Sequence, residues 1–175
     1  NPGNMPLDAL DKILSLAKEK DAAIRIGINS GSLEKEFLEK YGVGVESMLQ
    51  SMKKYVSYFE KKGFEKIVLS AKASDVALTV AINEVLAKEF PYPLHLGVTE
   101  AGVYETAVIK SAIGIGSLLL KGYGDTLRVS ITGDPLQEIP VAKEILTVLG
   151  LRKGVNVISC PTCGRCEYNM VDLAE

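Results

Sequence analysis

The chain has 175 residues, of which 47% are hydrophobic and 24% are charged. This composition supports a folded domain with a sizeable core and argues against intrinsic disorder. The formal net charge is only −2 at pH 7, whereas a nucleic-acid-binding domain would show a basic excess. The apolar stretch over residues 112–120 falls short of the roughly 18 residues of a membrane span. We therefore expect neither a nucleic-acid nor a membrane partner.

Helical and extended segments alternate along the chain. In chain order, the pattern predicts a helix over 7–20, a strand over 24–29, helices over 32–40 and 45–62, a strand over 66–71, a helix over 75–89, a strand over 94–98, a helix over 107–121, a strand over 126–131, a helix over 140–149 and a short strand over 156–159. Strands separated by helices in this order indicate parallel β/α units.

Four of these strands have one apolar face and one polar or small face, since alternate residues of a strand share a face. The apolar faces are formed by Ile24, Ile26 and Ile28; Ile67, Leu69 and Ala71; Leu94, Leu96 and Val98; and Leu127, Val129 and Ile131. A sheet covered by helices on both sides would show near-continuous hydrophobic strands. The pattern therefore favours a β/α barrel with a polar lumen, and four strands make half of the usual eight. We expect an α/β half of a TIM barrel over residues 1–155 and the start of a small second domain over 156–175.

The polar faces of the strands concentrate cations and hydrogen-bond donors. They carry Arg25, Asn29, Lys72, His95 and Arg128. A cation inside a barrel needs a counter-charge to offset its desolvation. The carboxylates of Asp75, Glu100 and Asp134, which follow strands, could provide it, and so could an anionic ligand. This set of donors suits a phosphate or diphosphate, and the alternative is a group of internal salt bridges.

Two residues of the third strand region are candidates for acid–base chemistry. Glu100 follows the strand directly, where barrel enzymes keep such residues. The alternative for Glu100 is a carboxylate stabilised by the N-terminus of the next helix. His95 is the only His of the chain, and a hydrogen-bonded structural role competes with a role in the site.

All three Cys residues, Cys160, Cys163 and Cys166, lie close together. A stabilising disulfide framework would spread its cysteines along the chain. Two thiolates separated by two residues suit zinc, an iron–sulfur cluster or a redox-active disulfide. Three thiolates do not complete a tetrahedral all-thiolate site, so a fourth ligand must come from elsewhere or one metal position stays open.

Short sequence motifs that contain these residues follow one another in a fixed order along the chain. They are residues 25–34, 71–75, 94–102, 110–116, 125–130, 133–135 and 158–165. Together they resemble the family of 4-hydroxy-3-methylbut-2-enyl diphosphate synthases over nearly the whole chain. The resemblance implies a reductive ring-opening and dehydroxylation of 2-C-methyl-D-erythritol 2,4-cyclodiphosphate to 4-hydroxy-3-methylbut-2-enyl diphosphate, in the non-mevalonate pathway of isoprenoid biosynthesis.

The resemblance also implies an iron–sulfur oxidoreductase of the bacterial cytoplasm. Its [4Fe–4S] cluster, held by three Cys and one Glu, would receive electrons from ferredoxin or flavodoxin. Cys160 and Cys163 match the first two ligands, Cys166 matches neither of the others, and these are expected beyond residue 175. A homodimer is implied, in which the cluster domain of one chain covers the barrel of the other.

By the same resemblance, five residues match substrate and diphosphate contacts: Arg25, Asn29, Lys72, Arg128 and Ser130. His95 matches a residue at the mouth of the barrel, and Asn1 matches a polar residue at the end of the fourth barrel strand. Glu100 matches the carboxylate proposed for proton transfer. Because half of the barrel and two cluster ligands have no match, we expect the chain alone to be inactive and to pair with itself through its open sheet edges. The alternative function is a phosphate-ligand-binding domain with a structural zinc at the Cys cluster.

Overall fold

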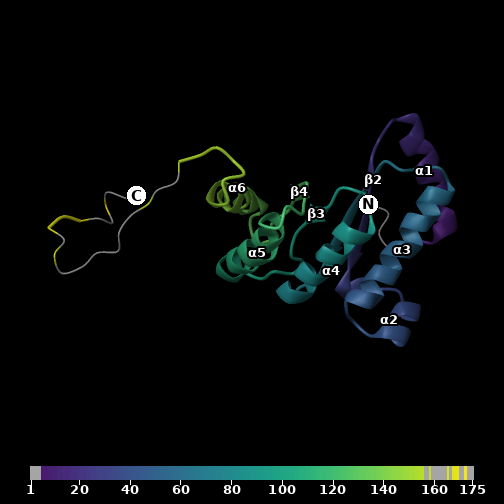
Figure 1. The fold of residues 1–175 in the computed structure, drawn as a ribbon, viewed down its shortest axis with the longest axis horizontal. Helices are drawn as coiled ribbons and strands as arrows, with labels where there is room; N and C mark the ends of the chain where they lie inside the picture. The colour runs from purple at the N-terminus through teal and green to yellow at the C-terminus, as the bar shows by residue number, and fades with distance from the viewer. Residues whose placement is uncertain (1–4, 156–157, 159–164, 166, 170–171, 173–175) are drawn as a thin grey trace.

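The computed structural model describes residues 5–155, together with residues 158, 165, 167–169 and 172. In chain order its elements are η1 (Leu7–Ala9), α1 (Leu10–Glu19), β1 (Ile24–Asn29), η2 (Ser30–Ser32), α2 (Lys35–Tyr41), α3 (Val45–Lys61), β2 (Ile67–Lys72), α4 (Val76–Glu89), β3 (His95–Leu96), α5 (Tyr104–Leu119), β4 (Thr126–Leu127), η3 (Pro135–Gln137) and α6 (Glu138–Val148). Helices α1, α2 and α3 gather at one end of the molecule, α5 and α6 lie at the other, and α4 lies between them (Figure 1).

The described strands are parallel and follow one another in chain order. β1 pairs with β2 along its whole length, and β3 pairs with β4. A bridge between Leu69 and Leu94 joins the two pairs, and the amide of Leu69 donates to the carbonyl of Pro93 at 2.8 Å. The resulting order, β1-β2-β3-β4, is that of consecutive β/α units in a barrel.

Helices cover one side of these strands and bury the apolar strand faces. Ile26 of β1 and Leu69 of β2 are almost completely buried, as are Met52 and Phe59 of α3 and Leu86 of α4. Each such side chain contributes roughly 1.5–3 kcal/mol through removal of apolar surface from water. The predicted α/β architecture is confirmed, with four parallel strands, helices on one side and the form of a partial barrel.

Strands β3 and β4 are shorter than the sequence pattern predicts. Beyond Leu96 and Leu127 the backbone keeps the inside–outside alternation, and Val98 and Val129 are buried. The amide of Arg128 still donates to the carbonyl of Leu96 at 2.9 Å. The regular ladder of β3 and β4 is limited to the pairs His95–Thr126 and Leu96–Leu127.

Helix α5 packs closely on the sheet at Gly114. A Cβ atom there would lie 2.8 Å from Cγ2 of Val98, so this glycine lets the helix approach the strand backbone. No helix of the described residues is both long and apolar enough to cross a bilayer. The predicted strand over 156–159 and the proposed domain over 156–175 fall mainly outside the described residues.

Candidate functional site

The register of the strands brings the predicted site residues into two rows across the polar face. β1 and β2 place Gly27 beside Ser70 and Asn29 beside Lys72, and β3 and β4 place His95 beside Thr126. Because Leu69 lies opposite Leu94, the same register continues from Ser70 to His95 and from Lys72 to Gly97. The first row is Gly27, Ser70, His95 and Thr126, and the second is Asn29, Lys72, Gly97 and Arg128.

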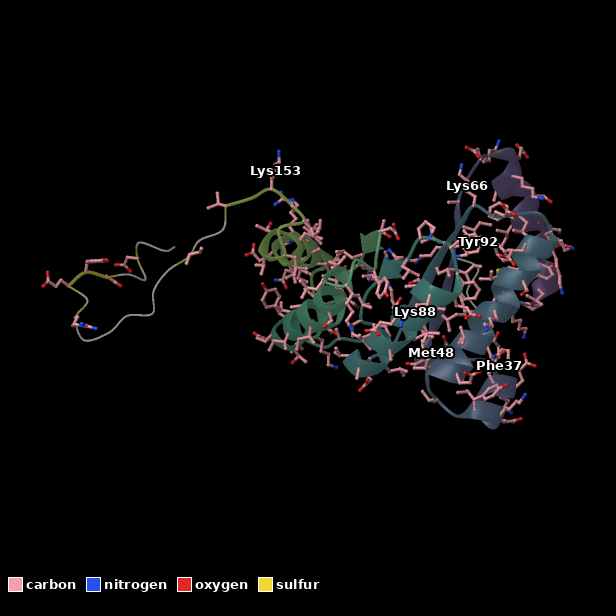
Figure 2. All side chains as sticks on the ribbon, viewed as in Figure 1. Phe37, Met48, Lys66, Lys88, Tyr92 and Lys153 are labelled. Carbon is pink, nitrogen blue, oxygen red and sulfur yellow. The ribbon has the colours of Figure 1, made fainter. Side chains whose placement is uncertain are left out.

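A polar cavity of about 170 Å³ lies over the second row. It is lined by Arg25, Gly27, Asn29, Ser70, Lys72, Thr99 and Arg128. Three of these residues are cations and none is a carboxylate. The cavity lies toward the carboxyl ends of the strands, whereas Lys66, labelled in Figure 2, precedes β2 and marks the opposite end of the sheet. We call Arg25, Lys72 and Arg128 the cation cluster.

Lys72 is the most strongly perturbed member of the cation cluster. Burial, followed by the positive charges of Arg25 and Arg128, lowers the pKa of Lys72 to about 8, and the carboxylate of Glu138 acts in the opposite direction. The ammonium group is still charged at pH 7. The cluster therefore holds more positive charge than its protein surroundings neutralise, which favours an anionic ligand.

The counter-charge of this region comes from a residue that the sequence pattern did not single out. Glu138 is the first residue of α6, and one of its carboxylate oxygens lies 3.6 Å from Nε of Arg128. The other oxygen accepts a hydrogen bond from the amide of Ile131 at 3.2 Å. An acidic residue in the first turn of a helix that follows a strand is the signal that could have indicated it.

The expectation that Asp75 and Asp134 provide lumen counter-charges is wrong. The carboxylate of Asp75 accepts from the amide of Leu78 at 2.6 Å and begins α4. The carboxylate of Asp134 accepts from the amide of Leu136 at 2.9 Å and begins η3. Both side chains satisfy backbone donors that a helix start leaves without partners.

Glu100 lies after β3, next to Thr99 of the cavity, and its side chain is exposed. Its backbone has a φ of 51°, and only Asp21 shares this feature among the described non-glycine residues. The left-handed conformation costs a residue with a Cβ atom roughly 1–2 kcal/mol. Strain of this kind is concentrated at functional sites, and Glu100 carries it beside the cavity residue Thr99.

His95 is the first residue of β3, and so lies farther from the strand ends than Lys72 or Glu100. Its Nδ1 atom lies 2.8 Å from Oγ1 of Thr126. Its Nε2 atom is buried without a hydrogen-bond partner among the described residues. Burial and then the positive charges of Lys72, Arg25 and Arg128 lower the pKa of His95 to about 4. The ring is therefore neutral at pH 7.

The remaining predicted residues are placed as follows. Ser130 is half-buried and lies two residues after Arg128, on the same side of the extended segment. Asn1, Cys160 and Cys163 lie outside the described residues. Within the described part of the chain, no group of three or more His, Cys, Asp or Glu residues is arranged to hold a metal ion.

A larger apolar groove, of about 430 Å³, lies between α5 and α6. Its lining includes Tyr104, Val108, Val141, Ile145 and Val148. It lies on the helices rather than at the strand ends, and it offers no convergent cations. The polar cavity is therefore the better candidate for chemistry.

Parallel strands, outer helices and a cationic cavity toward the carboxyl ends of the strands define a partial β/α barrel with a candidate anion site. Residues 1–143 match the family model described as "GcpE TIM-barrel domain", and the chain belongs to this family. The family recognised from the sequence motifs is thus confirmed.

Curated relatives carry the name 4-hydroxy-3-methylbut-2-en-1-yl diphosphate synthase (flavodoxin). The protein of Thermotoga petrophila is 51% identical over 175 residues, which cover 100% of this chain and 50% of the relative. The protein of Geobacter sulfurreducens is 51% identical over 178 residues, with the same coverage. That of Caldanaerobacter subterraneus is 52% identical, over 99% of this chain and 50% of the relative. The chain thus spans about half the length of these relatives.

Proposed function

We propose that this chain forms part of a 4-hydroxy-3-methylbut-2-en-1-yl diphosphate synthase, an oxidoreductase of isoprenoid biosynthesis. The substrate would be the cyclic diphosphate of 2-C-methyl-D-erythritol, which is opened and dehydroxylated by two-electron reduction. The observation that carries the proposal is the cation cluster in a carboxylate-free cavity. The names and the identity of the relatives support it.

In this proposal, the cation cluster binds the diphosphate. Arg25 and Arg128 present planar guanidinium groups that suit phosphate oxygens, and Lys72 adds a point charge between them. An anion in the cavity offsets the repulsion that lowers the pKa of Lys72. The amide of Asn29 and the hydroxyl of Ser130 would orient the substrate by hydrogen bonds to its oxygens.

Glu100 is proposed as the proton donor. A hydroxyl group leaves more readily as water, so the dehydroxylation needs a proton at the departing oxygen. Glu100 offers an exposed carboxyl group beside the cavity residue Thr99. Its left-handed backbone conformation is consistent with a side chain held in place for function.

The proposed cofactor is a [4Fe–4S] cluster that supplies the electrons when bound. Cys160 and Cys163 would provide two of its ligands, and their donor set fits, because thiolates two residues apart suit such clusters. Asn1 is proposed as a further substrate contact. The names of the relatives specify flavodoxin, which we propose as the electron donor, with ferredoxin as the alternative. A cytoplasmic homodimer completes the proposal.

Binding of inorganic pyrophosphate, measured by isothermal titration calorimetry, tests the anion site. Lys72→Met and Arg128→Met should each weaken binding by about tenfold or more, because a hydrogen bond to a charged group contributes roughly 1.5–3 kcal/mol. Lys66→Met is the matched control, since Lys66 pairs with Asp21 at 2.7 Å at the opposite end of the sheet. Equal affinities in the three variants would contradict the site.

Iron and sulfide analysis after anaerobic preparation tests the cluster, in a longer protein that also supplies the two ligands expected beyond residue 175. We expect both elements, a broad visible absorbance, and loss of the absorbance in Cys160→Ala and Cys163→Ala. Cys166→Ala should retain it. Zinc without sulfide would contradict the iron–sulfur proposal and favour a phosphate-binding domain with a structural metal.

A further inference from the structure

Two buried polar side chains of α4 contact the backbone at the end of β2. Thr79 and Asn83 are 1% and 0% exposed, and they lie one turn apart on the same face of the helix. Ile82 and Leu86, which α4 also buries, are apolar. A polar group in such a place costs free energy unless it is hydrogen-bonded, so the hydrogen bonds of Thr79 and Asn83 indicate why these two residues are polar.

The hydrogen bonds lie on both sides of Lys72. Nδ2 of Asn83 donates to the carbonyl oxygens of Ala71 and Thr79, each at 2.8 Å. Oγ1 of Thr79 accepts from the amide of Ala73 at 3.1 Å, and it lies 3.1 Å from the carbonyl oxygen of the same residue. The orientation of the Asn83 amide is determined, since the reversed orientation would place its oxygen against two carbonyl oxygens.

These contacts hold the two peptide groups that flank the Cα atom of Lys72. The carbonyl of Ala71 and the amide of Lys72 share one planar peptide group, and the carbonyl of Lys72 and the amide of Ala73 share the next. A hydrogen bond to each group restricts both backbone dihedral angles of Lys72, and these angles set the direction of its side chain. Ala71 and Ala73 have small, buried side chains, which leave space for the two contacts.

The Lys72 side chain needs this support, because its surroundings repel its charge. Burial, Arg25 of β1 and Arg128 after β4 all lower the pKa of Lys72, and Glu138 of α6 opposes them. An ammonium group in this position is stabilised by moving toward water. A fixed backbone limits that movement, and a site that is ordered before binding loses less conformational entropy when the ligand arrives.

We propose that Thr79 and Asn83 are positioning residues for Lys72, which fix its backbone and so keep its ammonium group in the cation cluster. As a role in ligand binding, this inference rests on the proposed anion site. The contacts extend to a second part of the cavity, because the carbonyl of Ala73 accepts from the amide of Thr99 at 3.2 Å, and Thr99 lines the cavity. Thr79 and Asn83 are not part of that lining, so they act on a ligand through the residues that they hold.

Calorimetry with inorganic pyrophosphate at pH 7 tests the inference. Thr79→Val keeps the shape of the side chain but removes the hydroxyl group, and Asn83→Leu removes the amide. Each should weaken binding about threefold to tenfold, because Lys72 is then ordered only when the ligand binds. Thr79→Ser should bind like the wild type. Ile82→Val is the control for a general loss of stability, since it truncates a buried neighbour on α4, and it should leave Kd unchanged.

The titration of Lys72 is a second measurement, and it requires no ligand. In ¹³C-lysine-labelled protein, the Cε signal of Lys72 is assigned by its absence in Lys72→Met. The wild-type residue should titrate with a pKa of about 8. In Thr79→Val the ammonium group can move away from Arg25 and Arg128, so the pKa should rise toward the ordinary value of 10.5. Ile82→Val should keep the wild-type pKa.

The outcomes separate the inference from the proposed function. Wild-type affinity and an unchanged Lys72 pKa in Thr79→Val and Asn83→Leu would overturn the positioning role. An equal loss of affinity in Ile82→Val would also overturn it, since the effect would then follow stability alone. If the wild type bound no pyrophosphate but the Lys72 pKa still rose in Thr79→Val, the anion site would be wrong and the positioning of Lys72 would stand.

Discussion

Gly97, which directly follows β3, lies beside Lys72 of β2, and the absence of a side chain at Gly97 makes room for the lysine. A Cβ atom at Gly97 would lie 3.2 Å from Cε of Lys72 and 2.5 Å from the carbonyl oxygen of Arg128. The glycine therefore leaves room for the side chain of Lys72 on one side and for the backbone of Arg128 on the other. Both belong to the cation cluster.

Gly97→Ala should destabilise the protein and weaken pyrophosphate binding together. The new methyl group meets backbone at Arg128, which cannot move aside as a flexible side chain can, and overpacking costs roughly 1–3 kcal/mol. Urea unfolding and calorimetry measure the two effects. Gly116→Ala is the control, because nothing lies within 4 Å of a Cβ there, and it should stabilise α5 by roughly 0.5–1 kcal/mol. Wild-type binding in Gly97→Ala would contradict the spatial role of this glycine.

Lys72→Met should make the unliganded protein more stable at pH 7. The pKa of Lys72 is about 8 in the folded chain, against an ordinary value of 10.5, so the buried charge opposes folding in full below pH 8. Allowing for partial exposure, the gain should be on the order of 1–2 kcal/mol. It should shrink as pH rises from 8 to 10.5, because the wild-type lysine then loses its proton more readily in the folded state. If Lys66→Met raised the free energy of unfolding by as much, the effect would not be specific to the cavity.

Glu138→Gln should tighten pyrophosphate binding. The amide oxygen can still accept from Ile131, but the negative charge near Arg128 is gone, so the cluster becomes more positive. At pH 6.5, where Lys72 stays charged, we expect a decrease in Kd of about threefold to tenfold. Glu144→Gln, on the exposed side of the same helix, should leave Kd unchanged. Weaker binding in Glu138→Gln would mean that the carboxylate serves mainly to position Arg128.

Glu100→Gly should be more stable than Glu100→Ala by about 1 kcal/mol, since glycine adopts a positive φ without the Cβ penalty. Asp21 has a φ of 52°, so Asp21→Gly and Asp21→Ala form a matched pair outside the cavity and should differ in the same way. Thermal unfolding of the four variants measures this. If alanine equals glycine at position 100 but not at position 21, Glu100 is not strained.

The isolated chain should associate with itself. Within the described residues, β1 and β4 each have a paired strand on one side only, and open strand edges promote pairing with another chain. Size-exclusion chromatography with light scattering at several concentrations should show dimers or larger species that dissociate on dilution. A well-folded monomer at all concentrations would exclude such pairing.

Sequence periodicity predicted the faces of the strands well but not the contacts between them. The alternation of Ile24, Ile26 and Ile28 with polar residues identified the apolar face, and the cations Arg25 and Lys72 do line one cavity. Periodicity contains no information on the register between strands, so the neighbours of Gly97 and Thr126 could not be foreseen. Pairing register depends on the packing of the assembled sheet.

The contact of Glu138 with Arg128 could not be predicted from the sequence either. It contacts Arg128 only because the turn after β4 returns the first residue of α6 to the strand. Asp75 and Asp134, which the sequence pattern favoured, accept hydrogen bonds from nearby backbone amides instead. Local hydrogen bonds thus took precedence over long-range charge pairing, as is common for aspartate at helix starts.

The two cross-strand rows also link ligand binding to folding. Arg25, Lys72 and Arg128 reach one cavity from different strand segments, so their mutual repulsion opposes the alignment that brings them together. A strand that slips by two residues would move its cation by roughly 6–7 Å. A bound anion therefore selects the correct register, and at a hundredfold excess over Kd it adds about 2.7 kcal/mol to the free energy of unfolding. The same molecule that occupies the cavity would act as an assembly factor for the sheet that surrounds it.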